Sequence, residues 1–142
     1  MEPKLTDMSL ISIMLIDDDE DDLDIFSQAL MKIDPSIQFA GFKNGMDALK
    51  LLNDSAIKLP DLIFLDLNMP CMNGFECLKK IRENRRLNNT PVIIYSTVTR
   101  LEGPIDPTYH PVKFLSKPAT FNEIIQALKI IISNHILETK DT

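Results

Sequence analysis

The sequence predicts an α/β domain with a doubly wound sheet of five parallel strands and helices on both faces. Short apolar runs alternate along the chain with segments whose apolar residues recur every three or four positions, which is typical of β-α-β units. Polar residues follow several of the apolar runs. In doubly wound sheets the functional site lies at the carboxyl ends of the strands, so these polar residues form the candidate site.

Four apolar runs and one mixed segment predict the five strands. Residues 12–16, 62–65 and 91–95 are continuous apolar runs typical of strands buried on both faces, and residues 112–115 form a fourth run. Residues 37–42 are more mixed, which predicts a strand near an edge. Parallel strands joined by right-handed crossovers are expected in such a sheet.

Helical spacing predicts the elements between the strands. The first helix should end at Asp34–Pro35, because a proline disfavours helical geometry in the residue before it. The positions expected to face the core are Leu23, Phe26, Leu30 and Ile33 in the first helix, Met46, Leu49 and Leu52 in the second, Phe75, Leu78 and Ile81 in the third, and Phe121, Ile124, Ile125, Leu128, Ile131 and Ile132 in a long C-terminal helix. Between Ser96 and Lys117, three prolines and a glycine predict that the fourth helix is short or irregular.

The bulk composition bounds the class of protein. A chain of 142 residues fits one domain, which we place at residues 11–138, with tails at 1–10 and 139–142. The net charge of −6 offers no basic surface for direct nucleic-acid binding. No apolar stretch is long enough for a membrane span and no signal peptide is evident, so we expect a soluble, cytoplasmic protein. Cys71 and Cys77 are expected to be reduced thiols.

The candidate site comprises Asp17 and Asp18 after the first apolar run, Asp66 after the run 62–65, Ser96 after the next, and Lys117 near the last. Carboxylates a few ångströms apart repel each other by about 4 kcal/mol per pair at an effective dielectric near 20. Mg²⁺ relieves that repulsion, and it favours carboxylates together with phosphate oxygens. An ammonium and a hydroxyl suit an anion held beside the metal. The group therefore predicts a magnesium-dependent phosphoryl site with a carboxylate nucleophile.

Five segments at these positions resemble the receiver domains of bacterial response regulators, the family that includes the chemotaxis regulator. The segments are residues 15–19 (LIDDD), 64–70 (FLDLNMP), 73–74 (NG), 94–96 (IYS) and 114–118 (FLSKP), and the likeness runs from about Ser12 to Leu137. The resemblance implies a flavodoxin-like fold with the strand order 2-1-3-4-5. It also implies a phosphoprotein of a two-component phosphorelay, acting as a stand-alone switch rather than as an enzyme.

The resemblance assigns a role to each site residue. Asp66 would accept the phosphoryl group and share Mg²⁺ with Asp18, a direct ligand, with Asp17, a ligand through water, and with the backbone carbonyl of Asn68. Ser96 and Lys117 would contact the phosphoryl group.

The resemblance also implies a switch and partners. Phe114 would be an aromatic switch whose rotamer follows Ser96, and a cis peptide would join Lys117 to Pro118. The phosphoryl group would come from a sensor histidine kinase or a histidine phosphotransfer protein, and the signal would pass to a downstream target protein by protein–protein interaction.

Other interpretations remain open. The acidic residues Glu20, Asp21 and Asp22 are interpreted as a solvated helix start, because acids favour the positive end of the helix dipole. A magnesium-dependent phosphatase with an aspartyl-phosphate intermediate would need a second acid two residues after Asp66, where this sequence has Asn68. An interaction domain of the same fold that works without phosphorylation is the other alternative, because the segment after Ser96 departs from the family pattern.

Overall fold

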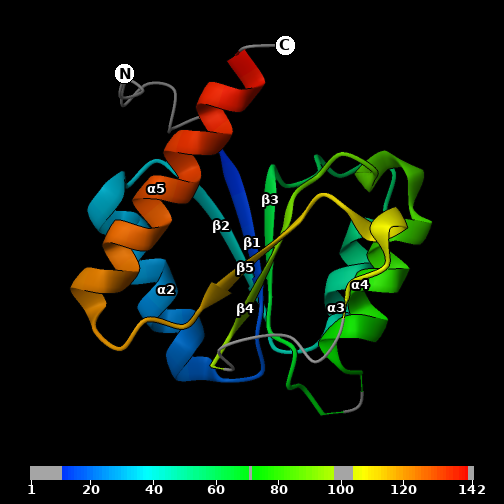
Figure 1. The fold of residues 1–142 in the computed structure, drawn as a ribbon, viewed down its shortest axis with the longest axis horizontal. Helices are drawn as coiled ribbons and strands as arrows, with labels where there is room; N and C mark the ends of the chain where they lie inside the picture. The colour runs from blue at the N-terminus through cyan, green and yellow to red at the C-terminus, as the bar shows by residue number, and fades with distance from the viewer. Residues whose placement is uncertain (1–10, 71, 98–103, 141–142) are drawn as a thin grey trace.

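The computed structural model describes residues 11–70, 72–97 and 104–140, and these form one five-stranded sheet flanked by helices (Figure 1). The strands are β1 (Ser12–Ile16), β2 (Gln38–Phe42), β3 (Leu62–Leu65), β4 (Val92–Ser96) and β5 (Val112–Ser116). All neighbouring pairs are parallel and the order is β2-β1-β3-β4-β5, as predicted from the sequence. β2 is an edge strand, in agreement with its mixed composition.

Four α-helices cover the two faces of the sheet. They are α2 (Glu20–Ile33), α3 (Gly45–Leu52), α4 (Gly74–Glu83) and α5 (Phe121–Lys140). α2 and α5 pack on one face, whereas α3 and α4 pack on the other (Figure 1). α5 runs two residues into the segment that the sequence suggested as a C-terminal tail. None of the helices within the described ranges is both long and apolar enough to cross a membrane.

The two faces carry separate hydrophobic cores because strand side chains alternate between them. Ile13 and Leu15 of β1 point toward α2 and α5, where Phe26 packs edge-on to Phe64 with ring centroids 4.9 Å apart. Met14 and Ile16 of the same strand point toward α3 and α4. The central strands are therefore buried on both sides, as their unbroken apolar runs predicted.

Two of the predicted core residues are exposed, and one cause accounts for both. Met46 is 64% exposed and Phe75 is 44% exposed. The helices α3 and α4 bury the glycine at their first position, Gly45 or Gly74, together with the residues three, four and seven positions later. Met46 and Phe75 each follow that glycine by one residue and lie beside the buried stripe, because one residue turns a helix by about 100°.

The connection between β4 and β5 contains, in its described part, the 3₁₀ turn η2 (Pro107–Tyr109). This agrees with a short or irregular fourth helix, although residues 98–103 lie outside the described ranges. Arg82 of α4 holds the connection by donating hydrogen bonds to the carbonyls of Tyr109 (2.6 Å) and Pro111 (2.8 Å). Among the described residues, the cis peptide bond is His110–Pro111. The expectation of a cis bond between Lys117 and Pro118 was therefore wrong.

Candidate functional site

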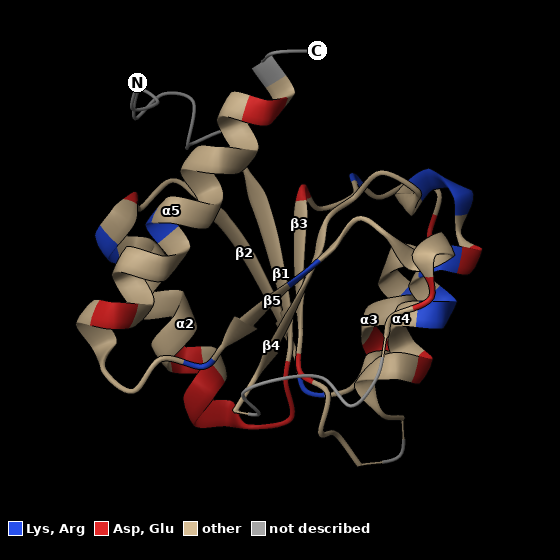
Figure 2. Cartoon of the chain, viewed as in Figure 1, with Lys and Arg blue, Asp and Glu red and all other residues tan. Residues whose placement is uncertain are grey.

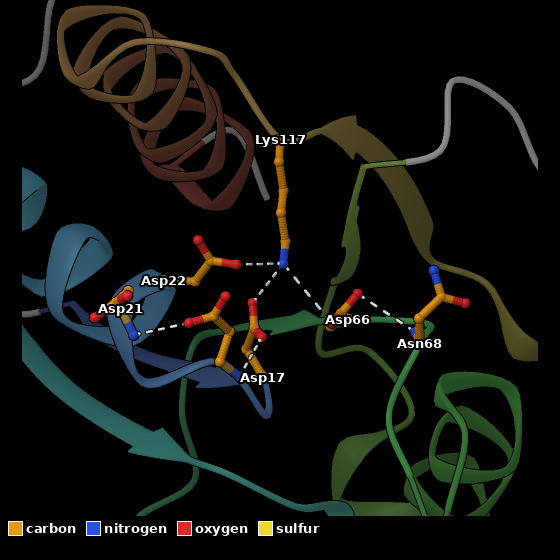
Figure 3. A network of polar contacts seen from close by, with 7 residues as sticks. Asp17, Asp21, Asp22, Asp66, Asn68 and Lys117 are labelled. Atoms are coloured by element: carbon orange, nitrogen blue, oxygen red, sulfur yellow. Dashed lines mark hydrogen bonds and ion pairs between the residues drawn. The ribbon is translucent and has the colours of Figure 1, made fainter.

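The carboxyl edge of the sheet, where all five parallel strands end, brings Asp17 and Asp66 together. Asp17 directly follows β1 and Asp66 directly follows β3, which is the neighbouring strand. Hydrogen bonds between neighbouring strands extend one residue beyond β1 and β3 and so fix the backbones of Asp17 and Asp66. Asp17 N–H donates to the Phe42 carbonyl and Asp66 N–H donates to the Ile16 carbonyl, each at 2.9 Å. The two carboxylates thus emerge side by side, as Figure 3 shows.

The pleat explains why these side chains share one face. Leu15, Phe64 and Leu115 all pack toward α2 and α5. Two residues further along each strand, the alternation returns to the same face, and these positions are Asp17, Asp66 and Lys117. The three charged residues that the sequence predicted at strand ends therefore lie on the same face of the sheet as the α2–α5 core, just beyond its last apolar residues.

Asp18 completes the acidic cluster from an exposed position. One carboxylate oxygen from each of Asp17, Asp18 and Asp66 lies within 4.8 Å of the others. Figure 2 shows acidic residues gathered where β1 runs into α2. Asp17 and Asp66 are 0% and 6% exposed, so Asp18 is the exposed member of the cluster.

Lys117 supplies the counter-charge. Its Nζ lies 2.8 Å from Asp17 Oδ2 and 3.7 Å from Asp66 Oδ2, and its side chain is only 12% exposed. Its backbone N–H donates to the Ser96 carbonyl at 2.7 Å, which aligns the end of β5 with the end of β4. The ammonium also lies 5.5 Å from the centre of the Tyr95 ring, within the range of a cation–π contact.

Asp22 is the site residue that sequence reasoning missed. Its Oδ2 accepts a hydrogen bond from Lys117 Nζ at 2.7 Å, so it is an ion-pair partner rather than a solvated helix-start acid (Figure 3). The neighbouring Glu20 and Asp21 are exposed, as expected for a helix start. The signal that could have found Asp22 is helical spacing, because Asp22 precedes the buried Phe26 by four residues.

Burial controls the ionisation of the cluster. Burial raises the pKa of Asp17 from 3.8 to about 6, against the opposing effect of Lys117. Burial likewise raises the pKa of Asp66, again opposed by Lys117. Burial alone would lower the pKa of Lys117, but its close contacts with Asp17 and Asp22 and the charges of Asp17 and Asp66 outweigh that effect and raise it. The ammonium thus stays charged, and ionisation of either carboxylate costs more than it would in water.

The donor set fits a divalent cation. Three carboxylates within 4.8 Å of one another carry more negative charge than one ammonium neutralises. Asp17 Oδ2 is buried and lies 2.8 Å from Lys117 Nζ. Within the described ranges, however, no donor points at this oxygen well enough to form a hydrogen bond with it. Hard cations such as Mg²⁺ and Mn²⁺ take oxygen ligands of this kind. Asp17, Asp18 and Asp66 would hold the ion.

The loop after Asp66 is held by a close contact with α4. Gly74 N–H donates to the Leu67 carbonyl at 3.0 Å, and a Cβ at Gly74 would lie 2.5 Å from the Asp66 carbonyl oxygen. Only glycine permits this approach. Asn73 begins α4 by accepting a hydrogen bond from Glu76 N–H at 2.9 Å. The Asn-Gly pair therefore sets the distance between α4 and the site.

Asn68 and Ser96 lie at the same edge of the sheet, whereas Phe114 lies in the middle of β5. Asn68 donates its backbone N–H to Asp66 Oδ1 at 3.4 Å, while its side chain is exposed. Ser96 is the last residue of β4 and is fully buried. Phe114, paired with Ile94 in the sheet, is partly buried against the α3–α4 core. Cys77 is buried as a free thiol, and burial raises its pKa to about 11. Cys71 lies outside the described residues.

Comparisons with known proteins agree with this geometry. The family model for the response regulator receiver domain matches residues 13–129. A probable transcriptional regulator, ycf29, of Pyropia yezoensis is 30% identical over 132 residues, which cover 89% of this chain and 55% of that protein. The chain spans smaller shares of other curated relatives, such as 6% of hybrid signal transduction histidine kinase D of Dictyostelium discoideum.

Two solved structures share the fold. The phosphorylated cyanobacterial phytochrome response regulator RcpA has a TM-score of 0.70 and 28% identity, and the match covers 85% of this chain and 90% of that one. The Mn²⁺-bound form of response regulator Rcp1 has a TM-score of 0.71 and 24% identity, with 85% and 91% covered. The chain belongs to the response regulator receiver domain family.

Proposed function

We propose that this domain is a signalling switch that is phosphorylated on Asp66 in a Mg²⁺-dependent reaction. The observation that carries the proposal is the pairing of a buried Asp66 carboxylate with two further carboxylates within 4.8 Å and an ammonium at 3.7 Å. Such a site has a nucleophile, oxygen ligands for a cation and a separate positive charge for the incoming phosphoryl oxygens.

Each site residue has a separate role in the proposed phosphoryl transfer. An Asp66 carboxylate oxygen attacks the phosphorus of a phosphohistidine, the new O–P bond forms, and the P–N bond breaks with its electron pair returning to the imidazole. Bound Mg²⁺, held by Asp17, Asp18, Asp66 and the Asn68 carbonyl, would supply charge neutralisation for the phosphoryl oxygens. Lys117 pairs with one phosphoryl oxygen, and Ser96 donates a hydrogen bond to another.

The switch part of the proposal concerns Ser96 and Phe114. Ser96 follows Ile94 by two residues at the end of β4, and Ile94 pairs with Phe114 in β5. A shift of the Ser96 hydroxyl toward the phosphoryl group would leave space behind it, which the partly buried Phe114 ring would fill. Phosphorylation would then shift a pre-existing equilibrium between two arrangements of this surface.

The partners are inferred from the chemistry of the site. A phosphohistidine on a sensor kinase or a phosphotransfer protein is the donor, and the signal passes by docking to a target protein, without direct contact to nucleic acid or membrane. We place this activity in the cytoplasm. Relatives that include hybrid histidine kinases support the two-component setting.

Incubation with acetyl phosphate tests the proposal. Wild-type protein with Mg²⁺ should gain one phosphoryl group, about 80 Da in intact mass. The same sample with EDTA, and Asp66→Asn with Mg²⁺, should gain none. Ser96→Ala should slow the gain, because one hydrogen bond to the phosphoryl group is lost. Equal labelling of wild type and Asp66→Asn would refute the assignment of the phosphoacceptor.

A further inference from the structure

The Lys117 ammonium lies near one carboxylate on α2 and near two carboxylates at the ends of β1 and β3. Its Nζ lies 2.7 Å from Asp22 Oδ2 on α2 and 2.8 Å from Asp17 Oδ2 after β1, but 3.7 Å from Asp66 Oδ2. Figure 3 shows the ammonium between these three side chains, with Asp22 on the side away from Asp66. Hydrogen-bond contact is thus made to Asp22 and not to the nucleophile.

The position of Asp22 is fixed by the start of α2. Asp19 caps the helix by accepting a hydrogen bond from Asp21 N–H at 2.9 Å, which makes Asp22 the third helical residue. That phase places Asp22 on the same stripe as the buried Phe26 and Ala29. Asp22 is therefore 31% exposed, whereas Asp21 is on the solvent side.

We propose that Asp22 is a positioning residue that holds the Lys117 ammonium aside, so that the ammonium competes less with a divalent cation for Asp17 and Asp66. The inference deepens the proposed function and rests on it. An ammonium bound to Asp22 keeps a full anionic partner when the metal takes the other two carboxylates. Without that partner, Lys117 would move onto Asp17 and Asp66 and occupy the oxygens that the metal needs.

The acidic helix start offers a matched control. Asp22→Asn and Asp21→Asn remove the same charge from adjacent residues of one helical turn, but only Asp22 contacts Lys117. Affinity for Mn²⁺ is measured directly from the electron paramagnetic resonance signal of the free ion. Asp22→Asn should bind Mn²⁺ about three- to five-fold more weakly than Asp21→Asn, the size of a partly exposed ion pair. Asp22→Glu should restore most of the affinity.

A double-mutant cycle separates competition from simple charge. In a Lys117→Met background the difference between Asp22→Asn and Asp21→Asn should disappear, because no ammonium is left to compete. A difference that persists unchanged would mean that Asp22 acts on the metal by charge alone, which overturns the proposal. Circular dichroism checks that each variant is folded. If Asp22→Asn does not fold, Asp22→Ser takes its place in the same cycle.

The outcomes distinguish this inference from the proposed function. If wild type binds no Mn²⁺ and takes no phosphoryl group, the proposed function fails and the inference falls with it. If wild type does both, but Asp22→Asn binds Mn²⁺ as tightly as Asp21→Asn, the proposed function stands and the role of Asp22 is refuted.

Discussion

Replacement of Asp66 by asparagine should stabilise the metal-free protein, although it removes the proposed phosphoacceptor. At an effective dielectric near 20, repulsion from Asp17 within 4.8 Å amounts to at least about 3.5 kcal/mol, and attraction to Lys117 at 3.7 Å to about 4.5 kcal/mol. The exposed Asp18 adds about 1 kcal/mol of repulsion, because water screens it. These charge–charge effects nearly cancel for the Asp66 carboxylate.

What remains is the cost of burying the Asp66 carboxylate, which is 6% exposed. A neutral amide of the same shape is cheaper to bury than a carboxylate, so we expect Asp66→Asn to gain about 1–2 kcal/mol at pH 7.5. For a chain of this length that corresponds to a rise in Tm of about 3–6 °C. The direction agrees with the raised pKa of Asp66, whose first cause is burial.

The pH dependence has a defined sign. Because the folded-state pKa values of Asp17 and Asp66 lie above their ordinary value of 3.8, the folded protein binds protons more tightly than the unfolded chain. These two groups therefore destabilise the metal-free fold at neutral pH, and the penalty is relieved as pH falls, for Asp17 from about 6 toward 4. The advantage of Asp66→Asn should shrink as the Asp66 carboxylate of the wild type becomes protonated.

Urea denaturation in EDTA, followed by circular dichroism because the chain has no tryptophan, measures the effect. Asp24→Asn is the control, since Asp24 is an exposed residue of α2 and the substitution makes the same change in net charge. Added Mg²⁺ should stabilise wild type and Asp24→Asn but have much less effect on Asp66→Asn. If Asp66→Asn is no more stable than Asp24→Asn in EDTA, the inference that burying the Asp66 carboxylate destabilises the metal-free protein is refuted.

Three further predictions concern Gly74, Arg82 and the pH dependence of Mn²⁺ binding. Gly74→Ala should cost about 1–3 kcal/mol of unfolding free energy and weaken Mn²⁺ binding, because the new Cβ would lie 2.5 Å from the Asp66 carbonyl oxygen. Unchanged denaturation curves and an unchanged Mn²⁺ affinity would contradict this prediction. Arg82→Met should cost about 2–4 kcal/mol in urea denaturation, since the carbonyls of Tyr109, Pro111 and Leu87 lose a charged donor. Arg85→Met should cost under about 0.5 kcal/mol, and equal losses would count against the Arg82 contacts. Mn²⁺ affinity should fall as pH drops below about 6, because protons then compete for Asp17, and a flat profile from pH 7.5 to 5 would be inconsistent with that pKa.

Much of the fold could be predicted from local pattern. Strands buried on both faces carry unbroken apolar runs, so β1, β3 and β4 were evident, and the mixed composition of β2 indicated an edge. The phases of α3 and α4 could not be predicted from apolar spacing. There a buried glycine occupies the first core position, and glycine contributes no apolar signal. Met46 and Phe75 were therefore assigned to the core wrongly.

The site was predictable where strand ends determine it. Parallel strands end at one edge, so Asp17, Asp66 and Lys117 had to be close, and the structure places them within ion-pair distance. Helical spacing places Asp22 on the buried side of α2, but its contact with Lys117 depends on the packing of α2 against the chain after β5, which spacing alone does not specify. The same limit applies to the contacts of Arg82 with Tyr109 and Pro111, because these two acceptors lie 27 and 29 residues further along the chain.

Reductive trapping of the labelled protein tests the central claim most directly. Borohydride converts an aspartyl phosphate to homoserine, and mass spectrometry of peptides then locates the converted residue. After acetyl phosphate treatment with Mg²⁺, the account predicts homoserine at position 66 and at no other aspartate, with none formed in EDTA. Conversion at Asp17, Asp18 or Asp22 in place of Asp66, or conversion that does not need the metal, would contradict it.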